Sequence, residues 1–145
     1  MRIIIIAILF SGLGFTQGFL HNMNGEVVDG NGEPILLRGF GLGGWLVPEG
    51  YMLHNQAWIE GFESPTDIEN HVKDLIGEEE ANNFWELYRS NYVAQSDIDK
   101  IAEWGFNHIR VPFHYKQFYD STGAETPIGY AIIDELITWL SLIHI

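Results

Sequence analysis

Hydrophobic positions in the second half of the chain recur with the spacing of amphipathic helices. Each such segment follows residues typical of a helix start, with a polar N-cap and Pro or an acidic residue in the first turn. The pattern predicts helices from Ser64 to Gly77, from Glu78 to Val93, from Ser96 to Gly105, and from Thr126 onward.

The first and third of these helices have the clearest boundaries. Ser64 is the expected N-cap, Pro65 the first helical residue and Gly77 the stop, while Ser96 begins the third helix and Gly105 ends it. The residues expected to face the core are Ile68, Val72, Leu75 and Ile76 in the first helix, Phe84, Leu87, Tyr88 and Tyr92 in the second, Ile98, Ile101 and Ala102 in the third, and Ile132, Ile133, Leu136 and Ile137 in the last.

Short apolar runs between turn residues predict β-strands. A hairpin is expected over 26–37, because Asp-Gly and Asn-Gly at 29–32 supply the positive φ of a tight turn. The run 35–37 is typical of a strand buried on both faces. A further strand is expected over 106–111 and ends at Pro112. Strands alternating with helices indicate an α/β fold with parallel strands.

The first residues have the layout of a secretory signal peptide. Arg2 supplies a positive charge, 3–10 is an apolar run, and Thr16 and Gly18 are suited to a cleavage site. The run is too short to span a bilayer, which takes about 20 residues. We therefore expect residues 1–18 to be removed from a secreted protein that does not insert into a membrane. An N-terminal core strand is the alternative interpretation.

Composition narrows the possible partners. The formal net charge of −13 argues against nucleic acids and anionic membranes. The absence of Cys excludes disulfides and thiolate metal ligands, and the histidines lack a metal-binding spacing, so we expect no metal and no cofactor. With 145 residues the chain is too short for a complete (β/α)8 barrel, which takes roughly 250.

Glycines at 39, 41 and 44 fit the dinucleotide-binding pattern G-x-G-x-x-G. That pattern requires a helix to begin at the glycines, but Pro48 and Gly50 leave little room for one. The alternative is structural, since small residues let a strand end pass close to a neighbouring backbone.

Trp45, Glu49 and Tyr51 follow the same strand. Ligands of parallel α/β proteins bind at the carboxyl ends of strands. An aromatic ring there can pack on a sugar, and a carboxylate can accept from its hydroxyls. The alternatives are core packing for Trp45 and a solvated loop acid for Glu49.

Arg110 and His114 lie at the end of the later strand. An Arg at this position is suited to keep a catalytic carboxylate ionised, or it forms an ordinary structural ion pair. His114 could donate to a substrate hydroxyl, or it is simply exposed in a loop.

Two segments together resemble family 5 glycoside hydrolases, in the cellulase and exo-1,3-glucanase branch. LRGFGLGGWL followed by EGY, over 37–51, resembles the first barrel strand and its loop, and 97–118 resembles the second helix–strand unit. The hairpin over 26–36 resembles the one that closes the bottom of such barrels.

The resemblance implies that residues 19–139 are the N-terminal part of a (β/α)8 TIM barrel, comprising the closing hairpin and about the first two βα units. It implies retaining hydrolysis of β-glycosidic bonds in β-glucan-type polysaccharides. Arg110 then matches the arginine beside the nucleophile, Glu49 and Tyr51 match an E-x-Y motif that contacts sugar, and His114 falls near the cleft.

The acid/base and nucleophile glutamates of that family lie on its fourth and seventh strands, which have no counterpart here. We therefore expect no catalytic residue within the chain and an inactive fragment. Residues 140–145 resemble a translated sequencing adapter, with a genuine apolar helix end as the alternative. A different functional class is also possible, namely a complete secreted carbohydrate-binding domain that uses Trp45, Tyr51 and Trp58.

Overall fold

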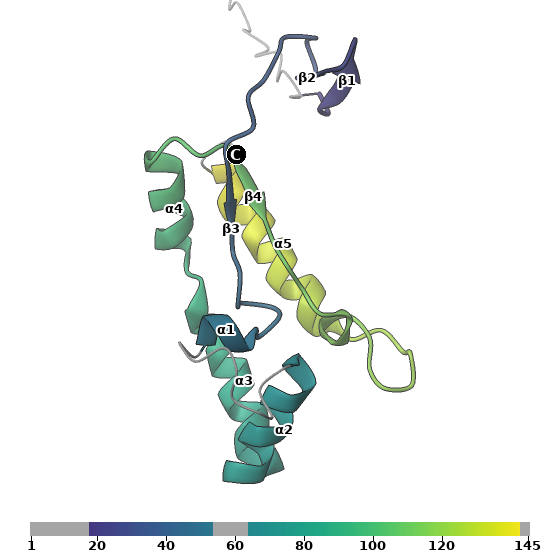
Figure 1. Ribbon diagram of the computed structural model, residues 1–145, viewed down its shortest axis with the longest axis vertical. Helices are drawn as coiled ribbons and strands as arrows, with labels where there is room; N and C mark the ends of the chain where they lie inside the picture. The colour runs from purple at the N-terminus through teal and green to yellow at the C-terminus, as the bar shows by residue number, and fades with distance from the viewer. Residues whose placement is uncertain (1–17, 54–63, 143–145) are drawn as a thin grey trace, which may run out of the picture. The chain divides into compact units, whose positions relative to one another are not determined.

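The computed structural model describes residues 18–53 and 64–142 as a mixed α/β arrangement (Figure 1). It comprises two compact units, residues 1–36 and 37–145, which we describe separately. The predictions for the signal peptide up to residue 17, for Trp58 and for residues 143–145 lie outside the described residues.

The first unit contains an antiparallel hairpin that the sequence analysis did not predict. Strand β1 (His21–Met23) pairs with β2 (Glu26–Val28). The turn between them is Asn24-Gly25, with φ values of 54° and 89°. Asn-Gly with both residues at positive φ is the preferred two-residue hairpin turn, so the signal was present in the sequence.

The hairpin expected over 26–37 forms only in part. Its turn is present, because the Asp29 carboxylate accepts hydrogen bonds from the backbone N–H groups of Asn31 at 2.8 Å and Glu33 at 3.0 Å. Beyond the turn only a single bridge joins Val28 and Pro34. The prediction of a buried strand at 35–37 is wrong: these residues form no strand, and Leu36 is 72% exposed. A strand buried on both faces needs covering layers that the described residues do not supply.

The second unit is built on a parallel strand pair, as expected of an α/β fold, but its first strand contains the glycines at 39 and 41, which were expected to follow a strand at 35–37. Strand β3 (Gly39–Gly41) runs beside β4 (His108–Arg110), with Phe40 opposite Ile109. A parallel bridge between Leu46 and Phe113 continues the pairing beyond both strands. Within 18–53 and 64–142 the sheets are two-stranded and no barrel is closed.

The predicted helices are present close to their expected bounds. They are α2 (Pro65–Ile76), α3 (Glu78–Tyr92), α4 (Gln95–Glu103) and α5 (Pro127–Leu142). The short helix α1 (Gly50–Leu53) precedes them, and the short helix η1 (Tyr115–Gln117) lies between α4 and α5. Ser64 caps α2 as expected, since its Oγ accepts from Asp67 N–H at 3.1 Å. The expected cap at Ser96 is wrong. Ala94 is the N-cap of α4, and its N–H donates to the Asp97 carboxylate at 2.8 Å.

Helices α4 and α5 contact each other and share one hydrophobic core with the strand pair (Figure 1). The buried residues of this core are Leu42, Trp45, Leu46, Val93, Ile98, Ile101 and Leu136. Inward positions were thus predicted correctly for Ile98, Ile101 and Leu136. They were wrong for six residues that are at least 41% exposed, namely Leu75, Ile76, Phe84, Leu87, Tyr92 and Ile137. Each lies on an apolar helix face that is wider than the surface its neighbours cover.

Two further observations bear on the alternatives left open above. Leu140 packs against the core and α5 continues to Leu142, which is compatible with either origin of the last residues. The described residues are mainly helical, whereas most secreted carbohydrate-binding modules are β-sandwiches of many short strands.

Candidate functional site

The carboxyl ends of β3 and β4 lie at one edge of their sheet because the strands are parallel. The backbone continues this pairing past the strands. Leu42 N–H donates to the Arg110 carbonyl at 2.9 Å, and His114 N–H donates to the Leu46 carbonyl at 3.1 Å. The two segments that carry the sequence-predicted site residues therefore run side by side.

Glu49 and Tyr51 come together after β3. The Glu49 carbonyl accepts from the N–H groups of Met52 at 2.9 Å and Leu53 at 3.1 Å, which starts α1. The Tyr51 hydroxyl donates to Glu49 Oε1 at 3.4 Å. Tyr51 is 61% exposed and Glu49 is partly exposed. This pair can stack on a sugar and accept from its hydroxyls.

Arg110 ends β4 with an exposed side chain. Its guanidinium makes no hydrogen bond or ion pair with any residue in the described part of the chain. The ordinary ion pair weighed for Arg110 is therefore not formed among these residues. Its five N–H donors are free to hold a carboxylate from elsewhere.

His114 is the N-cap of η1 rather than a free loop residue. Its Nδ1 accepts from the backbone N–H of Lys116 at 3.3 Å. Its ring lies against Tyr115, with the centroids 4.6 Å apart. If Nδ1 accepts, the neutral ring carries its proton on Nε2, so that nitrogen is the donor available to a ligand.

Trp45 is placed differently from a sugar platform. It is only 3% exposed, and its Nε1 donates to the Arg89 carbonyl at 2.7 Å. Core packing, the alternative weighed for this residue, describes its environment. Trp45 acts as an anchor that fastens the loop after β3 to helix α3.

Tyr88 is a second anchor, and the sequence analysis treated it only as part of an apolar face. Its hydroxyl donates to the Gly44 carbonyl at 2.7 Å. Burial, and then the neighbouring Tyr92, raise the pKa of Tyr88 above its ordinary value, so the hydroxyl remains a proton donor. Tyr88 lies at helical spacing from other aromatic residues, and this pattern indicates an apolar helix face without revealing the hydrogen bond to Gly44.

The glycine pattern serves the turn and a close approach, not a nucleotide. Gly44 has a φ of 80°, and an added Cβ would lie 2.6 Å from the Tyr92 hydroxyl oxygen. Helix α1 starts only at Gly50, so no helix N-terminus faces the glycines. The condition set for a dinucleotide site is not met.

The described part of the chain offers no candidate metal site and no candidate membrane-spanning helix. Residues 18–53 and 64–142 contain no cluster of at least three His, Cys, Asp or Glu suited to hold a metal ion. In the same residues no helix combines the length and apolar character needed to cross a membrane.

Comparison with known proteins relates the chain to glycoside hydrolases. No protein-family model matches it. It is 30% identical over 118 residues to "Glucan 1,3-beta-glucosidase 1" of Schizosaccharomyces pombe, which covers 80% of this chain and 28% of that protein. It is 31% identical over 132 residues to "Glucan 1,3-beta-glucosidase" of Lachancea kluyveri, covering 83% and 29%.

A "Beta-xylosidase" of Phanerodontia chrysosporium is 29% identical over 115 residues, covering 77% of this chain and 23% of that protein. The chain thus spans roughly a quarter of the length of these curated relatives. The relationship to glycoside hydrolases agrees with the resemblance found in the sequence.

Proposed function

We propose that this chain is the N-terminal part of a secreted family 5 glycoside hydrolase that cleaves β-glucan-type polysaccharides with retention of configuration. One observation carries the proposal. Arg110, which has no partner among the described residues, ends β4, and the Glu49–Tyr51 pair follows the parallel strand β3, in the chain order of that family. The printed names of the relatives, glucan 1,3-β-glucosidases and a β-xylosidase, support β-linked sugars as substrates.

Each residue has a distinct part in this proposal. Glu49 and Tyr51 bind sugar on the non-reducing side of the scissile bond. Arg110 holds the nucleophilic carboxylate and keeps its pKa low, because an adjacent positive charge favours the ionised form. His114 donates to a substrate hydroxyl through Nε2. In this proposal Trp45 holds the loop after β3 against α3 and does not contact sugar.

The catalytic carboxylates come from later strands. Retaining hydrolysis needs a nucleophile and an acid/base about 5–5.5 Å apart. Neither is assigned within this chain, so residues 19–139 supply one wall of the cleft and not the reaction. We also propose that residues 1–18 are a cleaved signal peptide and that residues 140–145 derive from a sequencing adapter.

The test begins with the reading frame that contains this chain. The proposal expects the frame to continue past Trp139 through a strand with an Asn-Glu pair and a later strand with a second Glu. In the product of the whole frame, Arg110→Ala should lower kcat on a β-1,3-glucan by about 100-fold, as loss of one charge-stabilising donor does in other enzymes.

Lys100→Ala is the control for that experiment. Lys100 is exposed on α4, and among the described residues its side chain pairs only with Glu103, at 2.6 Å. Its loss should leave kcat unchanged. A full-length product with normal kcat after Arg110→Ala would contradict the role given to Arg110. A product that binds glucan without cleaving it would favour the binding-domain alternative.

A further inference from the structure

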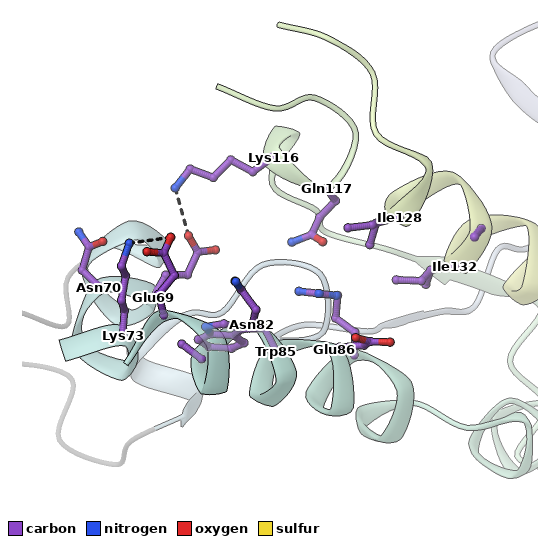
Figure 2. Close-up of a pocket in the computed structure, with 14 residues that line it drawn as sticks. Glu69, Asn70, Lys73, Asn82, Trp85, Glu86, Lys116, Gln117, Ile128 and Ile132 are labelled. Atoms are coloured by element: carbon purple, nitrogen blue, oxygen red, sulfur yellow. Dashed lines mark hydrogen bonds and ion pairs between the residues drawn. The ribbon is translucent and has the colours of Figure 1, made fainter. Parts of the chain in front are cut away.

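A cavity of about 760 Å³, lined by both charged and apolar side chains, lies between α2, α3, η1 and the start of α5 (Figure 2). Its size falls within the ~300–1,000 Å³ of typical small-molecule sites. Helices α2 and α3 contribute Glu69, Asn70, Lys73, Glu78, Ala81, Asn82, Trp85, Glu86 and Arg89, and the opposite wall contributes Lys116, Gln117, Ile128, Ala131 and Ile132. Arg89 and Lys116 contact the strand-end site through their backbone, as partners of Trp45 and His114, and the side chains that line the cavity take no part in that site.

The charges that line this cavity cancel. Its lining contains Glu69, Glu78 and Glu86 against Lys73, Arg89 and Lys116. Lys116 Nζ lies 3.1 Å from Glu69 Oε2, and Lys73 Nζ lies 3.0 Å from Glu78 Oε1 (Figure 2). Both lysines are therefore already paired. An anion such as phosphate would have to compete with these carboxylates, so the cavity does not favour an anionic ligand.

The cavity nevertheless offers unused hydrogen-bonding groups. Trp85 Nε1 is buried and has no hydrogen-bond partner among the described residues. A buried donor without a partner is unfavourable. Nε1 has no accessible surface, so a ligand acceptor bonds to it when the indole turns toward the cavity that its side chain lines. Asn82, one turn earlier on α3, adds an amide that can both donate and accept.

Arg89 adds the N–H donors of its guanidinium group to the cavity lining. Its side chain is half-buried, and burial lowers the pKa of Arg89, opposed by the nearby Glu69 and Glu86. The guanidinium stays protonated, because the ordinary pKa of arginine lies far above neutral pH. Planar donors beside carboxylates and amides suit a ligand that is uncharged and carries many hydroxyl groups.

We propose that this cavity is a second saccharide-binding site, which takes a neutral oligosaccharide through Trp85, Asn82 and Arg89. Neutral sugars match the cancelled charges, the mixed donors and acceptors, and the aromatic ring of the lining. The choice of a β-glucan as ligand rests on the proposed function. The site itself rests on the cavity.

The test is a titration of the full chain with laminaritriose, a trimer of β-1,3-linked glucose, followed by the indole N–H signals in ¹H–¹⁵N NMR spectra. The Trp85 signal, assigned by its loss in Trp85→Phe, should move, while that of Trp104, which is exposed and does not line the cavity, should stay. Trp85→Phe keeps an aromatic ring but lacks the donor, and should weaken binding at least fivefold. Trp104→Phe, at an exposed position outside the cavity, should leave it unchanged.

Two further variants make each outcome decisive. Asn82→Ala alters an exposed lining residue and should also weaken binding, even if Trp85→Phe does not fold. Tyr51→Ala removes the strand-end contact and should leave the Trp85 shift in place. A Trp85 signal that does not move would overturn the cavity site, as would its loss in Tyr51→Ala or a stronger response to inorganic phosphate. None of these outcomes bears on the proposed function, which is tested separately by hydrolysis of β-1,3-glucan by the full-length product.

Discussion

The hydrogen bonds that join α3 to the turn after β3 can be tested one at a time. The Tyr88 hydroxyl donates to the Gly44 carbonyl at 2.7 Å. On the adjacent residue, Trp45 Nε1 donates to the Arg89 carbonyl, also at 2.7 Å. Tyr88→Phe removes the first bond and keeps the ring. The second bond then reports how firmly the turn is still held.

The size of the effect follows from the burial of Gly44. A neutral hydrogen bond contributes ~0.5–1.5 kcal/mol, and a buried carbonyl left without its donor raises the cost toward ~1–3 kcal/mol. Since about 1.4 kcal/mol corresponds to a factor of ten, local opening of the turn should become about 5- to 150-fold more frequent. Each opening exposes the Trp45 indole N–H to solvent.

Solvent exchange of the Trp45 indole proton, followed by NMR, measures this opening. Tyr88→Phe should speed the exchange, whereas Tyr115→Phe should not. Tyr115 is 62% exposed, and its hydroxyl makes no hydrogen bond within the described residues. An unchanged exchange rate in Tyr88→Phe, or an equal acceleration in both variants, would refute the anchoring role given to this hydroxyl.

The same contact should depend on pH. Burial and Tyr92 raise the pKa of Tyr88 above its ordinary value of 10.0. A raised pKa on folding means stability that is complete below the unfolded pKa and is lost as the pH rises beyond it. The turn should therefore weaken from about pH 10 upward, and Tyr88→Phe should remove this loss. Tyr119 also raises the pKa of Tyr130 through a hydrogen bond, so absorbance titration should show late ionisation that is smaller by one tyrosine in the variant, and an unchanged amount would contradict the assignment.

Two other substitutions test local structure through the free energy of unfolding in urea. Ser64→Ala should cost about 0.5–2 kcal/mol because it removes the N-cap of α2. Ser96→Ala should cost under about 0.5 kcal/mol, since Ser96 caps no helix; equal costs would contradict this. Gly44→Ala should cost more than about 1 kcal/mol, because Gly44 has a φ of 80° and an added Cβ would meet Tyr92. Gly41→Ala, with open space around it, should be nearly neutral, and the reverse order would show that the turn is not strained.

Features with local causes could be predicted from the sequence. Helix α2 begins and ends as expected because Ser64, Pro65 and Gly77 act through their own backbone and nearest neighbours. The parallel pairing of β3 and β4 also followed from the alternation of strands and helices.

Features that depend on distant neighbours could not be predicted. Leu75 and Leu36 have the right hydrophobicity for a core, but their burial depends on elements that the described residues do not place over them. Trp45 was open to two interpretations until α3 was seen to accept its indole hydrogen. The cavity was missed because its charges belong to separate helices, and sequence spacing does not show that they pair across the gap.

The anomeric configuration of the first sugar released tests the central claim most directly. The product of the complete reading frame is incubated with a β-1,3-glucan, and the new reducing end is observed by ¹H NMR before mutarotation. The account predicts the β-anomer, because a nucleophile held by Arg110 gives double displacement and net retention. The α-anomer would contradict it, and so would a reading frame that ends at Ile145.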